Sequence, residues 1–384
     1  MITLTKLDRN NLDVIRPYIK RYGGIFNDLT LGTRFMWGDE FGIEYAVVND
    51  TLIMRETFSE HSSFYYPLGE DVATAVSEIE RYCKETGKYA VVFGCLSDVQ
   101  TAELLERYAG AKVHYYRDWC DYVYPAEQFK TYAGKKLAGQ RNHVNKFKRL
   151  YQGYKVRLIV KDDIPAVKEF LREYEKENEM SDWAAEEEPR VYELLDNMGK
   201  LDQFGIIVTV GGKIISLAIG EIVGDTLFEH VEKGLKSYEG VYPFTAQEFA
   251  KAFATGGVTK INREEDCGDL GLRTSKMQYH PSEIRAKNYV TVRSSFFNIV
   301  PPVCFATERL TVTDILREDG KAYAKLYTDD KINEFYGYDY RQDLGNNQPN
   351  GDYFFKFMSD LKAKKEEYSL AVRLGDKMIG EIVF

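Results

Sequence analysis

The sequence has no uninterrupted apolar run of the length that a bilayer-crossing helix needs, and the apolar stretch 204–223 is broken by Lys213 and Glu221. Its first residues, MITLTKLDRNN, contain no basic region followed by an apolar segment, so they do not read as a secretion signal. The five cysteines are scattered and include no CxxC pair, which is unlike a disulfide framework or a zinc site. These absences predict a cytoplasmic protein without a membrane span.

Several signatures of catalytic and cofactor sites are also missing. There is no P-loop, no nucleophile elbow and no dinucleotide-binding fingerprint. The five histidines lack the spacing of metal ligands, so we expect neither a metal nor a tightly bound cofactor. The net charge of −9 argues against a protein that coats nucleic acid with its whole surface, although it permits a local basic patch.

What the sequence does contain is a threefold repetition. Stretches rich in apolar and β-branched residues, each broken by a short turn, predict hairpins at 41–58, 204–223 and 368–384. A short strand that leads through Asp into an amphipathic helix precedes each hairpin. These openings begin at Ile2, Val156 and Glu308. Three copies of strand, helices and hairpin at nearly one period indicate three structural repeats.

The mixed order of strands and helices predicted for the first repeat resembles the GNAT acyltransferase fold. The resemblance implies an α/β fold of tandem GNAT-like domains, with mixed, mostly antiparallel sheets flanked by helices and a partial third unit. The expected parts are a first repeat at 1–125, a linker helix at 126–153, a second repeat at 154–301 and a third unit at 302–384. The third unit is expected to be truncated and inactive, because the sequence stops at Phe384 within its third strand. The first repeat is expected to lack a cofactor, because Glu70 and Asp71 would repel phosphate at its helix start.

One strongly basic segment, 135–149, lies between the first two repeats of this acidic chain. Apolar residues at helical spacing predict an amphipathic helix whose other face is basic. One interpretation is a linker helix with a solvated face, and the other is a docking surface for a polyanion such as tRNA or a phospholipid headgroup. Under the second interpretation Arg141, Asn142 and Lys146 contact the anion.

The predicted strand 225–233 of the second repeat carries His230 and Glu232. Strand alternation places both on one face, where they form either a candidate acid–base pair or an ordinary hydrogen-bonded pair. After the strand, Lys236 is placed to meet a phosphate, and Gly240 gives the backbone freedom. The segment does not match the Q/R-x-x-G-x-G/A loop of GNAT enzymes, so it does not predict an acetyl-CoA site.

A dense polar cluster follows the next predicted strand, in NREEDCGDLGLRTSKMQYHP. Polar residues crowded at the carboxyl end of a strand, with glycines that permit close backbone approach, are typical of a functional site. The alternative is a capped loop whose acids satisfy the amides of the next helix. The candidate residues in this segment are Asn262, Arg263, Glu264, Asp266, Arg273, Lys276 and Tyr279.

These residues, together with EHVEKG and the GKK…QRNHVNKF segment, resemble a bacterial family grouped with the catalytic C-terminal domain of phosphatidylglycerol lysyltransferases. The resemblance covers most of residues 1–295. It implies a tandem GNAT architecture and a relationship to enzymes that transfer an aminoacyl group from charged tRNA to a lipid headgroup. The chain lacks the membrane-spanning flippase part, so a lipid headgroup, a small molecule and a peptide all stay open as acceptors.

The leading hypothesis is transfer of an aminoacyl group from aminoacyl-tRNA to an amine or hydroxyl. Glu232 or His230 would be the base, Tyr279 would protonate the leaving group, and Asp266 belongs to the same catalytic set. The residues expected to bind substrate or co-substrate are Lys236, Gly240, Asn262, Arg263, Glu264, Arg273, Lys276, Arg141, Asn142 and Lys146. One alternative is an N-acetyltransferase with acetyl-CoA as co-substrate, and another is a non-catalytic ligand-binding protein built from degenerate GNAT repeats.

Overall fold

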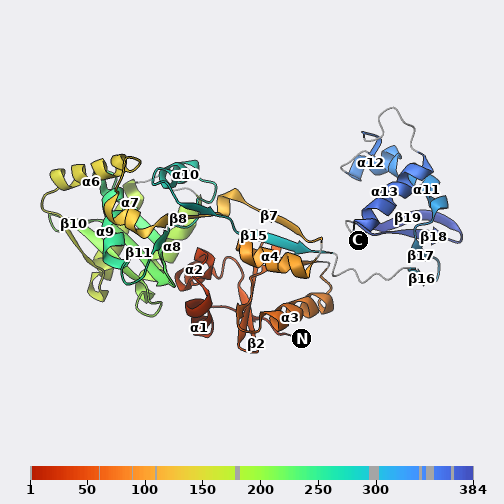
Figure 1. Ribbon diagram of the computed structural model, residues 1–384, viewed down its shortest axis with the longest axis horizontal. Coiled ribbons are helices and arrows are strands. Elements are labelled where there is room, and N and C mark those ends of the chain that lie inside the picture. Colours follow the sequence, from red (N-terminus) through yellow and green to blue (C-terminus); the bar gives the residue numbers. More distant parts are fainter. Residues whose placement is uncertain are drawn as a thin grey trace. The chain divides into compact units, whose positions relative to one another are not determined.

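The computed structural model describes residues 2–59, 61–88, 90–108, 110–177, 182–293, 302–336, 340–342, 350–364 and 367–383. Two units are distinguished. The larger holds the chain up to residue 82 with 92–103 and 113–290, and the smaller holds 83–91, 104–112 and the chain from 291 onward. Figure 1 labels their helices and strands. No helix in these ranges combines the length and the apolar character that crossing a membrane requires.

The first sheet follows the order β1-β2-β3-β4-β6-β15-β7, with β5 paired to β3. Its strands are β1 (Thr5–Lys6), β2 (Glu44–Val48), β3 (Thr51–Phe58), β4 (His61–Phe64), β5 (Leu68–Gly69), β6 (Val91–Leu96), β7 (Lys112–Tyr115) and β15 (Asn288–Val292). The helices of this part of the chain are α1 (Leu12–Tyr22), α2 (Leu31–Trp37), α3 (Val72–Glu85) and α4 (Asp98–Arg107).

The second sheet follows the order β14-β8-β13-β12-β11-β10-β9. Its strands are β8 (Asp121–Pro125), β9 (Lys155–Leu158), β10 (Phe204–Val210), β11 (Lys213–Val223), β12 (Thr226–Gly234), β13 (Lys260–Asn262) and β14 (Glu283–Arg285). The helices are α5 (Ala126–Thr131), α6 (Ala138–Leu150), α7 (Ile164–Glu177), α8 (Asp182–Asn197), α9 (Val241–Phe253) and α10 (Leu270–Met277). The predicted turn between β10 and β11 is present, and Gly211 and Gly212 both have positive φ there.

The two faces of the second sheet support two different cores. Leu217 and Ile219 of β11 pack into a core that also contains apolar residues of α1, α2, α7 and α8. Ile215 and Ala218 pack instead with apolar residues of α5, α6 and α9. Because α1 and α2 precede the first hairpin, the first of these cores joins the first repeat to the second.

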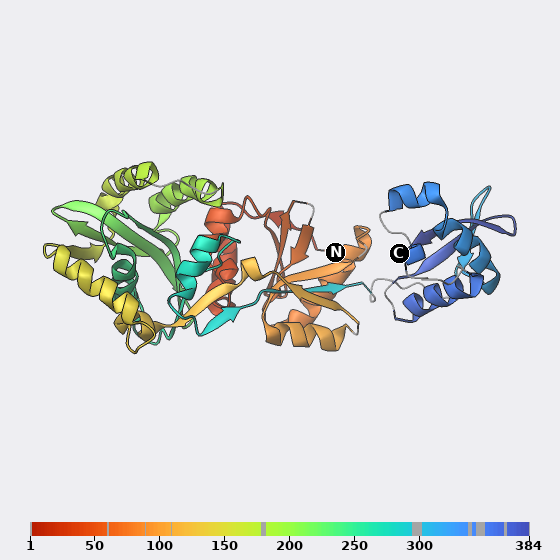
Figure 2. The ribbon, with the colours of Figure 1, turned by 90° about the horizontal axis from the view of Figure 1, so that it is seen from above.

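Two strands are exchanged between the first and second sheets. β8 precedes the linker helix in sequence, yet it lies between β14 and β13 of the second sheet. β15 follows the second repeat's helices, yet it lies between β6 and β7 of the first sheet. Figure 2 shows the two connections, in gold and cyan, running between the sheets. The expected boundaries at 125 and 154 stay a prediction about domains, but the sheets do not follow them.

The third sheet, in the order β16-β17-β18-β19, belongs to the smaller unit. Its elements are β16 (Cys304–Ala306), β17 (Thr311–Asp314), α11 (Gly320–Tyr327), α12 (Asp330–Tyr336), α13 (Gly351–Ala363), β18 (Ser369–Leu374) and β19 (Lys377–Val383). Tyr323, Tyr327 and Phe354 are buried between its helices and strands. The order of strand, helices and hairpin matches the openings of the other two repeats, as the sequence predicts.

A similar turn precedes the first helix of each of the three repeats. The amide of Asp8 donates to the side chain of Asn11 over 2.8 Å. The amide of Val160 donates to Asp163 over 2.9 Å, and that of Leu316 donates to Asp319 over 2.7 Å. The predicted Asp is therefore present in the opening turn of two repeats, with Asn in its place in the first, and it accepts the amide three residues earlier. The N-cap residues of α1 and α11 do not cap their own helices with a side chain.

Candidate functional site

The candidate site lies where two parallel strands separate. β12 and β13 pair only from Thr226–Lys260 to Phe228–Asn262. Beyond this point β12 continues to Gly234, whereas the segment after β13 is a loop. The carboxyl ends of neighbouring strands are a common place for ligands, because side chains and loops converge there. The polar cluster predicted from the sequence occupies this loop.

A β-bulge in β12 corrects the predicted arrangement of its side chains. Gly220 pairs with Glu229 and Ile219 with Val231, so His230 is the extra residue. An extra residue shifts the alternation beyond it by one position. Glu232 therefore lies on the same side of β12 as Glu229, since both contact Arg263. His230 instead contacts Glu264. The prediction that His230 and Glu232 share a face is wrong.

His230 lies between two carboxylates. Its Nδ1 is 2.7 Å from Oε1 of Glu264, and its Nε2 is 3.0 Å from Oε1 of Glu221. Burial would lower the pKa of His230, but the hydrogen bonds with Glu221 and Glu264 raise it to about 10. The ring is therefore a buried imidazolium, which differs from the free base expected from the sequence.

Two neighbours fix Glu221 in this relay of Glu221, His230 and Glu264. The amide of Gly32 at the start of α2 donates to Glu221 over 2.6 Å, and Gln203 donates to it over 3.0 Å. A Cβ at position 32 would lie 2.7 Å from Nε2 of His230, so only glycine fits there. Glu264 is the accessible end of the relay, with 23% of its side chain exposed.

Glu264 has the features of an acid–base group. Burial raises its pKa to about 7, although the hydrogen bond with His230 opposes the rise. Its φ of +58° is unusual for a residue with a side chain, and such backbone strain is concentrated at functional sites. The sequence places Glu264 among the binding residues, whereas its geometry suits proton transfer at neutral pH.

On the other side of β12, Arg263 forms ion pairs with Glu229 and Glu232. Glu229 is buried, and the side chains of Glu232 and Arg263 are only 10% exposed. Burial raises the pKa of Glu232 to about 8. The guanidinium also lies 5.0 Å from the ring centre of Tyr279, which stacks on Phe129 at 5.1 Å. Burial raises the pKa of Tyr279 above its usual value, so its phenol keeps its proton. The predicted roles of Glu232 and Tyr279 stay predictions.

The remaining predicted residues of the loop hold its backbone in place. Lys276 donates to three successive carbonyl oxygens, those of residues 263, 264 and 265. Asp266 is fully buried and accepts from Arg273 over 2.7 Å and from Tyr122 over 2.5 Å. Although burial opposes it, the hydrogen bond from Arg273 lowers the pKa of Asp266 to about 2. Arg273 and Lys276 are thus engaged within the protein, whereas we expected them to bind substrate or co-substrate.

Asn262 also has a structural partner on each side. Its Nδ2 donates to Asp121 over 2.7 Å, and its Oδ1 accepts from the amide of Glu264 over 2.8 Å. Asp121 belongs to a second buried cluster around Lys287, which sequence reasoning did not find. The Nζ of Lys287 lies 2.6 Å from Asp28, 2.8 Å from Asp121 and 3.1 Å from Glu265. No local pattern marks Lys287, because its partners come from distant parts of the chain.

The predicted basic helix is α6, and part of its charge is already engaged. Arg141 donates to the carbonyl oxygens of Tyr132 and Gly134. Lys146 forms an ion pair with Glu239. Asn142 is exposed to solvent. The exposed basic side chains in this part of the chain are Lys135, Lys136, Arg149 and Lys236.

Helix α6 covers the start of α9. Gly240 has a φ of +82°, and a Cβ there would collide with the carbonyl oxygen of His143 on α6. The rings of Phe147 and Phe244 stack 4.2 Å apart beside it. Gly240 therefore uses the predicted backbone freedom, and it permits the close packing of two helices. Its predicted part in binding stays a prediction.

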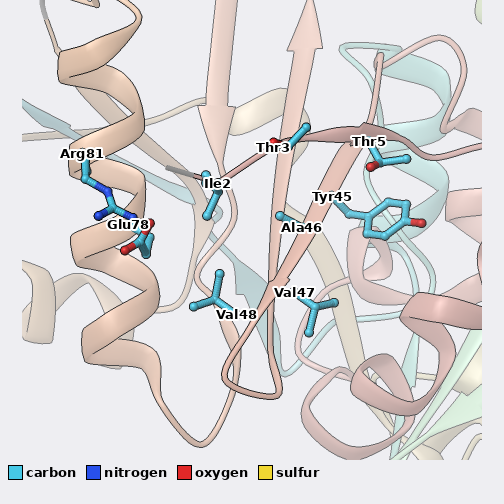
Figure 3. Close-up of a pocket in the computed structure, with 9 residues that line it drawn as sticks. All are labelled: Ile2, Thr3, Thr5, Tyr45, Ala46, Val47, Val48, Glu78 and Arg81. Carbon is cyan, nitrogen blue, oxygen red and sulfur yellow. Dashed lines mark hydrogen bonds and ion pairs between the residues drawn. The ribbon is translucent and has the colours of Figure 1, made fainter.

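Two hollows in the larger unit contain none of the predicted residues. The first, of about 520 Å³, is lined by Ile2, Thr3, Thr5, Tyr45, Ala46, Val47, Val48, Glu78 and Arg81. In Figure 3, residues 45–48 of β2 point alternately to its two sides, and Glu78 and Arg81 come from α3. The second, of about 330 Å³, is lined by Gly23, Gly24, Ile25, Val223, Gly224, Asp225, Lys260 and Arg285. Neither hollow is the polar cluster at the ends of β12 and β13.

Comparisons with known proteins identify similar chains. Residues 22–291 match a family described as "Phosphatidylglycerol lysyltransferase, C-terminal". A conserved protein of unknown function from Bacteroides thetaiotaomicron is 25% identical, with a TM-score of 0.71 over 76% of this chain and 100% of that chain. The structure of L-PGS from Bacillus licheniformis is 15% identical, with a TM-score of 0.52 over 74% and 91%. No curated protein matches. The predicted α/β fold with mixed, mostly antiparallel sheets flanked by helices is confirmed.

Proposed function

Because the chain belongs to the family of phosphatidylglycerol lysyltransferase C-terminal domains, we propose that it is a GNAT-fold aminoacyltransferase whose donor is an aminoacyl-tRNA. An amine or hydroxyl of the acceptor attacks the carbonyl carbon of the aminoacyl ester. A bond forms between that nucleophile and the acyl carbon, and the bond to the ribose oxygen of the tRNA breaks. The nucleophile loses one proton, and the ribose oxygen gains one.

The choice of donor rests on one observation: α6 covers the start of α9. A coenzyme A pyrophosphate needs free amides at a helix N-terminus. Around this turn the amides of Leu235, Tyr238 and Val241 donate to backbone carbonyls, and that of Glu239 donates to Tyr151. Pro243 has no amide to offer, and α6 packs on Gly240. This arrangement leaves little room for a pyrophosphate and favours a donor that binds through another surface.

We assign the proton transfer to Glu264. Its carboxylate is the accessible end of the relay, and burial raises its pKa to about 7, so it can accept a proton near neutral pH. His230 holds the carboxylate in place as a positioning residue, and Glu221 holds His230. Glu232 and Tyr279 are the base and the proton donor in the hypothesis drawn from the sequence. Both contact Arg263 in the structure, and they remain secondary candidates.

The donor would dock on the exposed basic side chains of α6 and its surroundings. Each phosphate that a protein neutralises releases counterions, so binding weakens steeply with salt. Lys135, Lys136 and Arg149 are exposed and have the charge that such a contact needs. Arg141 and Lys146 serve the fold, so they are poor choices for a test of docking.

The test measures binding of tRNA and of acetyl-CoA to the full chain at several salt concentrations. We expect salt-dependent tRNA binding, and the triple variant Lys135→Ala/Lys136→Ala/Arg149→Ala should weaken it and reduce the slope of log K against log salt by roughly one to three. The charge-matched control Lys321→Ala/Lys325→Ala/Lys356→Ala changes exposed lysines of the smaller unit and should have no effect. Acetyl-CoA binding without tRNA binding would overturn the proposal.

A further inference from the structure

The three tryptophans of the chain gather at one place. Trp37 ends α2, Trp119 lies in a short turn before β8, and Trp183 lies near the start of α8. The ring centres of Trp37 and Trp183 are 6.0 Å apart, and those of Trp119 and Trp183 are 5.8 Å apart, both in edge-on contact. Each side chain is partly exposed. Three large aromatic rings that meet at the surface offer apolar area and π faces to a ligand.

The elements that carry this tryptophan cluster also contact the relay of Glu221, His230 and Glu264. The first turn of α2 binds Glu221 through the amide of Gly32 and contacts His230, and the same helix ends at Trp37. The turn that carries Trp119 contacts the loop that carries Glu264, since the amide of Cys267 donates to the carbonyl oxygen of Asp118 over 3.0 Å. Close by, the amide of Tyr122 donates to the carbonyl of Glu264 over 3.1 Å. The aromatic cluster and the accessible carboxylate are therefore carried by elements that contact one another, and we refer to these elements as one wall.

The ionisable groups linked to Glu264 carry more acid than base. Linked by contacts among the described residues are the carboxyl groups of Asp28, Glu56, Asp121, Glu221, Glu264 and Glu265. The basic groups beside them are Arg34, His230, Lys276 and Lys287. Burial raises the pKa of Asp121 to about 6 and that of Glu264 to about 7. Although burial opposes it, Lys287 lowers the pKa of Asp28, and the hydrogen bond with His230 lowers that of Glu221. A cation at the wall would relieve this excess.

We propose that the tryptophan cluster and Glu264 together bind a primary ammonium group of a substrate. Aromatic faces attract ammonium through their quadrupoles, and a partly exposed carboxylate adds a charge-assisted hydrogen bond. One of these rings already attracts a cation, because the guanidinium of Arg190 lies 4.4 Å over the ring of Trp37 and occupies that face. The ammonium comes from the aminoacyl ester or from the acceptor amine, and only this assignment of its source rests on the proposed function.

Tryptophan fluorescence of the full chain tests the site directly, because every tryptophan of the chain is part of it. Alanine ethyl ester represents the aminoacyl end, ethanolamine represents an acceptor amine, and N-acetylalanine ethyl ester lacks the charge. We expect a saturable change with one of the two amines and none with the neutral ester. The amine that binds identifies the source of the ammonium.

Variants separate the site from a general effect on folding. Glu264→Gln should weaken binding about tenfold or more, since a charged hydrogen bond is lost. Glu248→Gln changes an acid of α9 that pairs with Lys251, and it should bind as the wild type does. Trp183→Phe should weaken binding while circular dichroism shows an intact fold. An equal response to the neutral ester, or no response to either amine, would overturn the proposal. Neither result depends on tRNA binding, so a failure here is distinct from a failure of the proposed function.

Discussion

The Nδ1 atom of His230 lies 2.7 Å from a carboxylate oxygen of Glu264, just beyond the point where β12 and β13 stop pairing. The other ring nitrogen faces Glu221 at 3.0 Å. A histidine that donates to carboxylates from both nitrogens carries two protons and a positive charge. His230 therefore orients Glu264 and supplies charge to the site.

His230 should stay protonated well above neutral pH. Burial opposes the charge, but the two carboxylates raise its pKa from 6.5 to about 10. Imidazole ¹⁵N spectra at about pH 8 should show the doubly protonated ring, with His230→Gln identifying the signal. Glu264→Gln should lower the titration midpoint. A singly protonated ring in the wild type at that pH would contradict the assignment.

The same pKa predicts how stability changes in alkaline solution. Because the folded-state pKa is raised, the ion pairs of His230 stabilise the fold fully below pH 6.5 and are lost as the pH rises through about 10. The urea midpoint of the wild type should therefore fall over that range. His230→Gln should be less stable at neutral pH and should show a smaller decline. Parallel curves for the two proteins would count against this role.

Arg263→Met should destabilise the protein strongly. It leaves Glu229 and Glu232 buried without their cation, and removing one partner of a buried ion pair costs about 3–5 kcal/mol. The loss should shrink as the pH falls, because a buried carboxyl with a raised pKa takes up a proton more readily in the folded state. Urea unfolding at two pH values measures both effects.

The matched double variant is Arg263→Met/Glu232→Gln. It removes one of the two unpaired charges, so it should recover part of the lost stability. If the double variant is no more stable than Arg263→Met, the damage comes from lost packing against Tyr279 and Phe129.

Lys287→Met should also destabilise the protein, by about 3–5 kcal/mol, because Asp28, Asp121 and Glu265 lose their shared cation. The nearby Arg285→Met is the control, since its head group pairs with the half-exposed Glu283 and a backbone carbonyl. The control should cost clearly less in the same urea measurement. Equal losses would mean that Lys287 does not hold this cluster together.

Gly240→Ala should weaken the contact between α6 and α9. The substitution places a side chain at a φ of +82° and drives it against His143, which should cost about 1–2 kcal/mol or more. Gly139→Ala on α6 is the matched control, because a Cβ there meets nothing within 4 Å. Its stability should stay the same or rise by up to about 1 kcal/mol. If Gly240→Ala leaves the stability unchanged, α6 does not pack tightly against the start of α9.

The architecture could be predicted from the sequence because its signals are local. The hairpins are marked by turns such as Gly211–Gly212, and the repeats are marked by the Asp or Asn in each opening turn. The strand exchange could not be predicted, because it concerns which edge each strand joins. Nothing within the five residues of β15 says that it inserts between β6 and β7.

The candidate site could be predicted in place but not in detail. The crowded polar residues after β13 mark the loop correctly, yet the bulge at His230 depends on the pairing of β12 with Gly220 of β11. A single extra residue then decides that Glu232 faces Arg263 while His230 faces Glu264. Lys287 and Glu221 were missed because their importance comes from partners far away in sequence.

The insertion of β15 between β6 and β7 also sets an order of events during synthesis. The ribosome delivers both neighbours long before residues 288–292 emerge, so β6 and β7 wait for their common partner. During that interval each has an edge with unpaired backbone groups, which invites pairing with another nascent chain. The first sheet becomes complete only when most of the second sheet has already been made, so the two must mature together.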